Sequence, residues 1–230
     1  MYQQQHIEFI IQKAKKRLDQ QEAPGCTKAG WLMITALLIE SWDIYSMAFI
    51  LFALKDIYEP SSWLLGFTAA GTQLGAVVGA LLGGWLTDKL GRRKIFLWSM
   101  ILFAIFAVLQ GLAPNMYWLA IIRCLAGIPV GADVANGFTY IMEVMPKGKR
   151  EVMANRWQFM FALGIIAAIL LVTTLVVLGI HPDLIWRIVL AVPAIPACVL
   201  LFMRRELPET PAWFVERGRF IEAKQASRDY

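Results

Sequence analysis

Four ionisable side chains lie inside long apolar stretches of this sequence: Glu40, Asp43, Arg123 and Asp133. A charge at the centre of a bilayer costs roughly 2.5–3.5 kcal/mol on insertion scales, so four of them would burden a purely structural bundle. A carboxylate that alternates between a proton and an arginine partner can couple proton entry to a conformational change, because each partner favours a different protonation state. These residues therefore indicate a polar, proton-handling pathway.

Asp43 and Arg123 are predicted to lie at nearly the same depth. At about 1.5 Å per helical residue, Asp43 lies about 17 Å and Arg123 about 12 Å below the outer ends of their segments. By the same estimate, Glu40 lies about 22 Å and Asp133 about 27 Å below the outer ends of their segments. Glu40 shares a helix face with Asp43. Asp43 and Arg123 can thus pair, as a proton-coupling pair or as a permanent structural salt bridge.

Three amide side chains are the candidates for contact with a solute: Gln158, Asn136 and Gln73. An amide can donate hydrogen bonds to, and accept them from, sugar hydroxyls or an oxyanion. For Gln158 the alternative is helix capping or packing.

The elements that must position these side chains are six apolar runs. The chain has 230 residues, of which 58% are hydrophobic and 17% charged, whereas soluble domains average about 45–50% and about 25%. About 20 apolar residues cross a bilayer as a helix, which satisfies its own backbone hydrogen bonds. We expect an all-α membrane protein with six transmembrane helices, at roughly 30–54, 63–87, 95–113, 116–142, 156–179 and 184–203.

Basic residues are concentrated on one side of the predicted membrane. The N-terminal segment, the second-to-third and fourth-to-fifth connections and the C-terminal tail hold five, four, four and six, against two on the other side. This split predicts a multi-pass protein of the plasma (cell) membrane with both termini cytoplasmic. Residues 1–29 are then a cytoplasmic leader, 30–203 the transmembrane domain, and 204–230 a cytoplasmic tail or the start of a linker.

The leader carries apolar residues at helical spacing between basic ones, which fits an amphipathic helix on the inner leaflet or a mobile segment. Those residues are Ile7, Ile10, Ile11, Ala14 and Leu18. The second apolar run carries a glycine at every fourth position: Gly71, Gly75, Gly79 and Gly83. Such a stripe lets another helix approach closely, either within the six helices or from a further membrane-embedded partner. Bends are expected at Pro129, Pro193 and Pro196.

Other kinds of function are disfavoured by the composition. The three cysteines and two histidines have no ligand spacing, and no nucleotide-binding loop is present. We therefore expect no metal, no cofactor and no enzymatic activity. The basic residues flank apolar runs rather than forming a patch with aromatic residues, so nucleic acid is not an expected partner.

Residues 84–94, Gly-Trp-Leu-Thr-Asp-Lys-Leu-Gly-Arg-Arg-Lys, resemble the G-x-L-x-D-x-x-G-R-R/K signature of the major facilitator superfamily. The stretch from Glu143 to Arg150 resembles its E-x-x-P-x-x-x-R element, and Trp186–Arg187 resembles the Trp-Arg that opens the sixth helix. Residues 208–211 resemble the P-E-S-P tail of the sugar-porter and phosphate-symporter branches. The resemblance assigns a conformational motif to Gly84, Asp88, Gly91, Arg92, Arg93, Glu143, Arg150 and Glu209.

The resemblance implies the N-terminal six-helix half of a twelve-helix secondary transporter, in which substrate is held between the halves. Asp43 with Arg123 is similar to the proton-coupling pair of sugar–proton symporters, and the stretches around Glu40 and Asp133 are similar to those of phosphate–proton symporters. Gln158 stands at the position of a substrate-contacting glutamine in both branches. The implied function is proton-coupled transport of a small polar metabolite, such as phosphate, a sugar or an organic acid.

The competing interpretation is a non-transporting membrane scaffold subunit of a larger complex. In either case we expect the six helices to need another membrane-embedded surface besides lipid: a second half, a second copy or a different subunit. The argument is that the glycine stripe and Asp88 lack their family partner, and that the four intramembrane charges would otherwise face lipid.

Overall fold

The computed structural model describes residues 24–146 and 148–229, and in this part of the chain six helical segments are long and apolar enough to cross a membrane. The expected all-α architecture with six spans is therefore confirmed. The spanning segments are α2 (Pro24–Tyr58), α3 (Ser62–Leu90), α4 (Arg92–Gly111), α5 (Met116–Val144), α6 (Arg150–Asn155) with α7 (Trp157–Val177), and α8 (Pro182–Ala191) with α9 (Ala194–Arg204).

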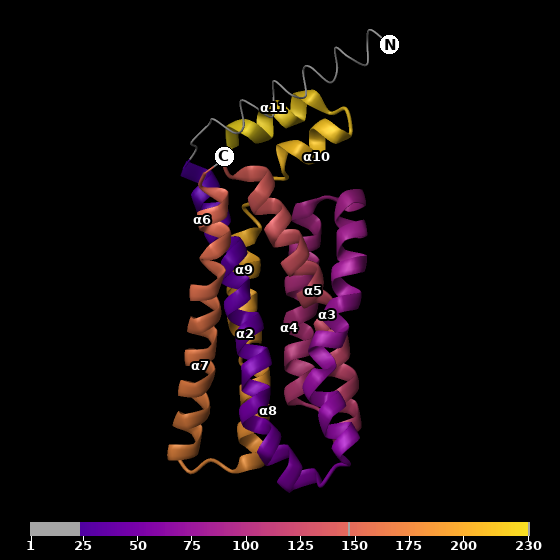
Figure 1. Cartoon of the computed structure of the whole chain (residues 1–230), viewed down its shortest axis with the longest axis vertical. Helices are drawn as coiled ribbons and strands as arrows, with labels where there is room; N and C mark the ends of the chain where they lie inside the picture. Colours follow the sequence, from indigo (N-terminus) through magenta and orange to yellow (C-terminus); the bar gives the residue numbers. More distant parts are fainter. Residues whose placement is uncertain (1–23, 147, 230) are drawn as a thin grey trace.

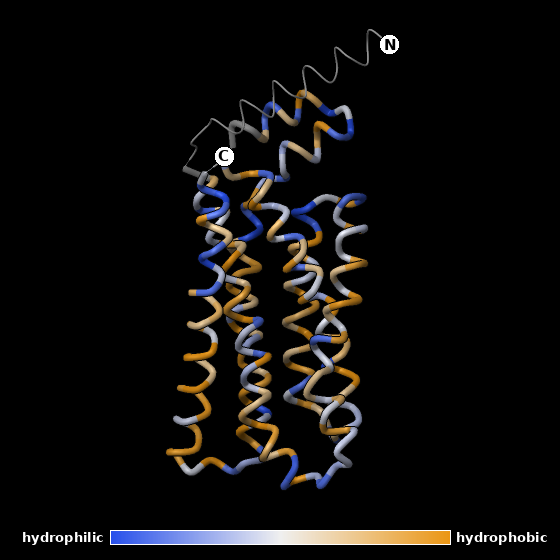
Figure 2. The backbone as a smooth tube through the Cα atoms, in the orientation of Figure 1, coloured by the Kyte–Doolittle hydropathy of each residue, from blue (hydrophilic) through white to orange (hydrophobic). Residues whose placement is uncertain are grey.

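Two ends of the bundle can be distinguished (Figure 1). The basic end, as we call it, is where α2 begins and where two short helices, α10 (Pro211–Glu216) and α11 (Phe220–Asp229), lie across the bundle. It also contains the short connection between α3 and α4 and is the more hydrophilic end (Figure 2). The opposite end contains the connections 59–61, 112–115 and 178–181.

The helices differ from the expected spans at the first, fifth and sixth spans, the fifth beginning at Arg150. Helix α2 begins at Pro24, inside the predicted leader, whereas the predicted amphipathic segment lies outside the described residues. The sixth span is two helices separated at Val192–Pro193, as a proline without an N–H would cause. Pro129, in contrast, lies inside the continuous helix α5.

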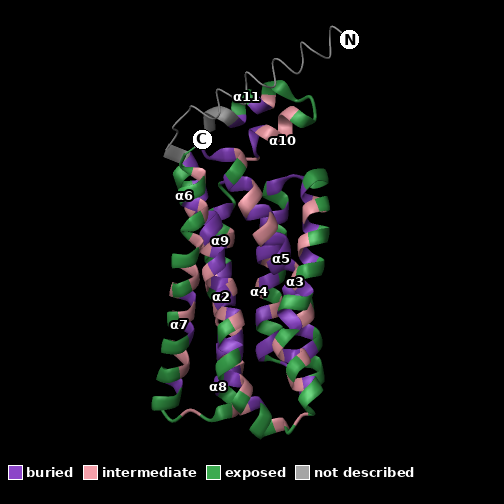
Figure 3. Cartoon of the chain, in the orientation of Figure 1, coloured by how far each residue is buried: buried purple, intermediate pink, exposed green. Residues whose placement is uncertain are grey.

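The buried side chains form two apolar clusters, one in each half of the bundle's length. The cluster near the basic end includes Phe96 and Tyr140, whose rings meet edge to face, and the cluster near the opposite end includes Trp186. The buried residues lie on the inside of the bundle, whereas the outward faces of α3 and α7 are exposed and apolar (Figure 3). An apolar outer surface is what helices surrounded by lipid require.

The glycine stripe of α3 packs against α5. A Cβ added at Gly75 would overlap the carbonyl oxygen of Cys124, and one at Gly79 would overlap that of Ile128. Two glycines of α5, Gly127 and Gly131, approach carbonyl oxygens of α3 in the same way. The stripe is therefore an internal contact, the first of the two alternatives, and the argument that it lacks a partner within the six helices is wrong.

The interlocked glycines predict a sharp difference between two alanine substitutions on the same helix. Gly79→Ala should lower the thermal unfolding midpoint, because overpacking typically costs about 1–3 kcal/mol. Gly66→Ala is the matched control, since nothing lies within 4 Å of its added Cβ and alanine favours a helix over glycine. Thermal unfolding of the purified protein in mild detergent measures both, and equal midpoints would contradict the contact.

Candidate functional site

A buried ion pair joins α2 to α5 in the half of the bundle that lies farther from the basic end. The Arg123 Nη2 atom lies 3.5 Å from Asp43 Oδ2, and both side chains are almost completely enclosed. The hydroxyl of Thr72, from α3, donates to the same Asp43 oxygen at 3.1 Å. The two residues that the depth estimate placed at one level are therefore in contact.

Two neutral acceptors also hold the Arg123 guanidinium. Its Nε donates to the carbonyl oxygen of Thr68 on α3 at 2.9 Å, and its Nη1 donates to Gln110 Oε1 on α4 at 3.1 Å. Gln110 is fully buried and was missed by the sequence reasoning. Its position in the last turn of an apolar helix is the signal that could have identified it.

The intramembrane charges are enclosed by the six helices themselves. Asp43, Arg123 and Asp133 are each less than 5% exposed. The expectation that they would face lipid without a second half is therefore wrong for these three. The close α3–α5 contact explains it for Arg123 and Asp43, because α3 supplies polar partners to both. Glu40 alone of the four is partly exposed.

A second buried ion pair lies nearer the basic end. Arg204 Nη1 lies 2.6 Å from Asp133 Oδ1, and Arg204 also donates to the carbonyl oxygens of Leu32 and Met33 on α2 at 3.1 and 3.3 Å. Its guanidinium lies 4.9 Å from the centre of the Phe96 ring. Assigning Arg204 to a cytoplasmic tail was therefore wrong: it is the last residue of α9 and is buried.

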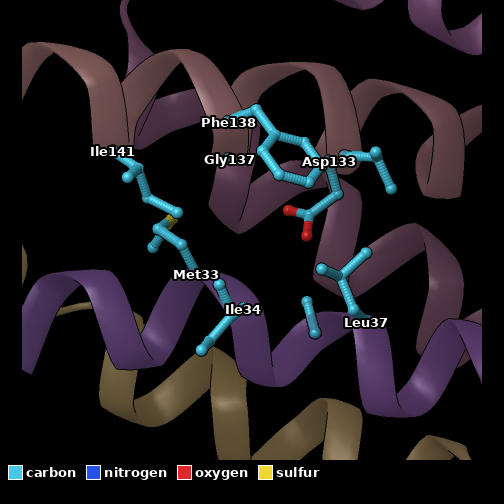
Figure 4. A pocket seen from close by; sticks show the side chains of 9 residues that line it. Met33, Ile34, Leu37, Asp133, Gly137, Phe138 and Ile141 are labelled. Carbon is cyan, nitrogen blue, oxygen red and sulfur yellow. The ribbon is translucent and has the colours of Figure 1, made fainter. Parts of the chain in front are cut away.

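Asp133 borders two small pockets. One lies between α2 and α5 and is also lined by Met33, Leu37 and Phe138, and Figure 4 shows the Asp133 carboxylate pointing into it. The other lies between α2, α4 and α5 and has Glu40 on its wall. Asp133 and Glu40 thus share a pocket, while Asp43 lines neither of the two.

The three candidate amides lie apart. Asn136 is buried, and its Nδ2 donates to the backbone carbonyl of Arg92 at 2.9 Å, so it belongs to the basic end. Gln73 and Gln158 are exposed, on α3 and α7 respectively. The structure therefore does not gather these amides around the Asp43–Arg123 pair.

The conformational motif forms a connected cluster at the basic end. Arg92 binds Glu143 through Nη2 at 2.7 Å and lies 3.5 Å from Asp88, whose side chain is largely exposed. Gly91 turns the chain between α3 and α4 with φ of +100°, a conformation suited to glycine. Arg150 is the first residue of α6. No atom lies within 4 Å of a Cβ added at Gly84, so this face of α3 is not packed against another described element.

Glu209 caps the first turn of α4. Its carboxylate accepts the backbone N–H groups of Arg92 at 2.8 Å and Arg93 at 3.1 Å, where the positive end of the helix dipole also favours an anion. Burial nevertheless raises the pKa of Glu209 above its usual value, although hydrogen bonds from Thr210, Arg93 and Arg92 oppose the rise.

A raised pKa at Glu209 makes stability depend on pH. The folded protein holds this proton more tightly than the unfolded chain, so the contribution is full below the unfolded pKa and is lost as pH rises through the folded pKa. Glu209→Gln cannot titrate. The thermal unfolding midpoint of the parent should therefore fall relative to that of Glu209→Gln as pH increases from about 4 to 8, and a constant difference would contradict this.

Helix α10 covers the end of α3. Trp213 Nε1 donates to the Asp88 carbonyl at 3.3 Å, and the Arg217 guanidinium donates to the carbonyls of Asp88 at 2.8 Å and Lys89. At the opposite end, Arg187 donates to the carbonyls of Gly111 at 3.2 Å and Ala113 at 3.0 Å. A cation is favourable at both helix C-termini.

Comparison with known proteins identifies the family to which the chain is similar. A model of the family "Sugar (and other) transporter" matches residues 4–229. The galactose-proton symporter of Escherichia coli (strain K12) is 33% identical over 195 residues, which are 85% of this chain and 41% of that protein. The D-xylose transporter of Levilactobacillus brevis is 35% identical over 175 residues, 76% of this chain and 37% of that protein.

The fold matches as well. The solved structure of the proton:xylose symporter XylE bound to 6-bromo-6-deoxy-D-glucose superimposes with a TM-score of 0.82 at 23% identity, covering 89% of this chain and 49% of that one. The chain thus spans less than half the length of these relatives. Among the described residues, no cluster of histidine, cysteine, aspartate or glutamate could hold a metal ion.

Proposed function

The chain belongs to the sugar (and other) transporter family of the major facilitator superfamily, and from that premise we propose that it is the N-terminal half of a sugar–proton symporter. A multi-pass membrane protein of this family is a transporter and not an enzyme. The proposed cargo is a pentose or hexose, because relatives that match most of this chain are named as galactose-proton and arabinose-proton symporters and a D-xylose transporter.

The observation that carries the proposal is the buried Asp43–Arg123 pair. Charged Asp43 holds Arg123 across the α2–α5 contact. A proton on Asp43 removes that attraction, and Arg123 then keeps only its bonds to Thr68 and Gln110. Protonation thereby loosens α2 from α5, and a carboxylate–arginine pair that changes in this way couples the proton to helix movement.

The remaining site residues have supporting roles in the proposal. Glu40 and Asp133 share a pocket on the basic side of Asp43 and are proposed to take part in proton handling. Exposed Gln158 is the amide we assign to sugar contact. The cluster around Arg92 and Glu143 is assigned to the conformational change.

The membrane arrangement is part of the same proposal. The basic end faces the cytoplasm of a plasma membrane, because that is where lysine and arginine residues gather. A second six-helix unit completes the sugar site, because this chain matches about two fifths of its relatives' length. Repeated six-helix halves commonly hold substrate between them.

Uptake by the transporter that contains this chain tests the proposal. In proteoliposomes with an acidic exterior, radiolabelled D-galactose, L-arabinose or D-xylose should accumulate above its external concentration, and a proton ionophore should abolish the accumulation. Failure of all three sugars to accumulate, in a protein shown to be folded, would reject sugar symport and favour the scaffold interpretation.

A further inference from the structure

Arg123 is shared between a charged and an uncharged acceptor on different helices. The distance from Nη1 to Gln110 Oε1 is 3.1 Å, whereas that from Nη2 to Asp43 Oδ2 is 3.5 Å. The guanidinium therefore lies closer to the neutral amide on α4 than to the carboxylate on α2. A shift of the cation towards either acceptor would weaken its bond to the other.

Two polar atoms in this cluster have no hydrogen-bond partner. They are Asp43 Oδ1 and Gln110 Nε2, and both are buried. Leaving a buried polar atom unpaired costs about 1–3 kcal/mol. Asp43 Oδ1 would gain a hydrogen bond if the Arg123 guanidinium moved towards α2, which is expected if this is one of two alternative arrangements of the cation; Gln110 Nε2 is itself a donor and gains nothing from that movement.

The backbone next to Gln110 is anchored from the other side. It is in the last turn of α4, and the carbonyls of the next residue, Gly111, and of Ala113 accept hydrogen bonds from Arg187 of α8. A bond from Arg187 Nη2 to the Tyr58 hydroxyl extends this contact to the end of α2. The end of α4 that carries Gln110 is thus tied to α8 and α2, and the Asp43–Arg123 distance can change relative to it.

Few other charges act at this point. Glu40 lies one turn from Asp43 on α2, with Asp133 across the pocket, and Cys124 follows Arg123 on α5. Helices α3 and α4 carry ionisable groups only in their turns at the basic end, α7 carries none, and Arg187 and Asp183 of α8 pair with each other. In the described part of the chain, Asp43 is therefore contacted by Arg123 and by the Thr72 hydroxyl, which donates to the same oxygen at 3.1 Å, and Gln110 acts on Asp43 through Arg123.

We propose that Gln110 is a positioning residue for proton coupling: its side-chain carbonyl competes with Asp43 for the Arg123 guanidinium and thereby sets the pH at which Asp43 binds its proton. The coupling role rests on the proposed function, whereas the effect on Asp43 titration does not. When Asp43 is protonated, Gln110 keeps Arg123 in place; when Asp43 is charged, Gln110 limits how firmly the ion pair closes.

Two substitutions of similar size should shift the titration of Asp43 in opposite directions. Gln110→Met removes the acceptor, so Arg123 moves fully to Asp43, stabilises its charged form and shifts the midpoint to lower pH by about one unit. Gln110→Glu adds an anion that competes for Arg123 and repels charged Asp43, which shifts the midpoint to higher pH by about as much. Gln110→Asn retains a shorter amide and should shift the midpoint less than Gln110→Met.

The titration is measured by infrared difference spectroscopy of the transporter that contains this chain, using the protonated carboxyl band that is lost in Asp43→Asn. Asn115→Asp, which adds a charge in the cap of α5, should leave the midpoint unchanged. Thermal unfolding identifies any variant that does not fold. If Gln110→Glu does not fold, the comparison of Gln110→Met with Gln110→Asn decides; if Gln110→Met or Gln110→Asn does not fold, the comparison of Gln110→Glu with Asn115→Asp decides.

Shifts of Gln110→Met and Gln110→Glu in the same direction, or midpoints equal to the parent's, would overturn the positioning role. Equal midpoints in Gln110→Met and Gln110→Asn would do the same. Opposite shifts in a protein that fails to accumulate any sugar would support the role of Gln110 and reject sugar symport, so the two proposals fail separately.

Discussion

Asp43→Asn should abolish proton-driven accumulation of sugar while leaving exchange of internal for external sugar in place. Asparagine has nearly the shape of the protonated aspartic acid but cannot release a proton. A gradient of about one pH unit supplies about 1.4 kcal/mol per proton, enough for about tenfold accumulation by the parent. The ratio of internal to external sugar in the variant should fall to about one.

The matched control for this experiment is Asp56→Asn, which makes the same chemical change at an exposed position of the same helix. It should retain the parent's accumulation ratio, because Asp56 lies outside the buried cluster. Equal accumulation by Asp43→Asn and the parent would remove Asp43 from the coupling mechanism. Loss of exchange together with accumulation would assign Asp43 to structure instead.

Breaking the Asp133–Arg204 pair should produce the largest loss of stability. Removal of one partner from a buried ion pair typically costs about 3–5 kcal/mol, because the other charge is left uncompensated. Arg204→Met leaves the Asp133 carboxylate without its 2.6 Å partner, and Asp133→Leu leaves the fully buried Arg204 guanidinium without an anion. Both single variants should show a markedly lower thermal unfolding midpoint in detergent.

The double variant Asp133→Leu/Arg204→Met should recover most of the loss, because apolar replacement of both partners is often neutral or stabilising. Arg205→Met is the control for the loss of one arginine, since Arg205 is exposed at the end of the same helix. A double variant no more stable than the single ones would show that the cost comes from packing and not from the unpaired charge.

The apolar runs predicted the six spans because a helix must fill the bilayer, a constraint that depends on composition more than on detail. Equal depth likewise predicted the contact between Asp43 and Arg123, because helical rise alone fixes how far each residue lies along its segment. Neither argument requires knowledge of which helices are neighbours.

Neighbouring helices and their rotation account for what was missed. Arg204 stands between an apolar run and a polar tail, so its sequence position fits either the last span or the tail. Its ion pair with a carboxylate of α5 places it in the span. Gln110 and Asn136 are both buried amides, yet Gln110 binds Arg123 and Asn136 binds the Arg92 carbonyl. The glycines of α3 predicted a close helix contact, but only the structure shows that the partner helix is α5, through its own glycines.

The most direct test of the central claim is proton movement triggered by sugar. In a lightly buffered suspension of cells or proteoliposomes that contain the transporter, addition of a transported sugar without any imposed gradient should alkalinise the medium, because each sugar carries a proton inward. The same addition to Asp43→Asn should leave the pH unchanged although labelled sugar still equilibrates. Sugar entry into the parent without alkalinisation, or alkalinisation by Asp43→Asn equal to that of the parent, would contradict coupling through Asp43 and Arg123.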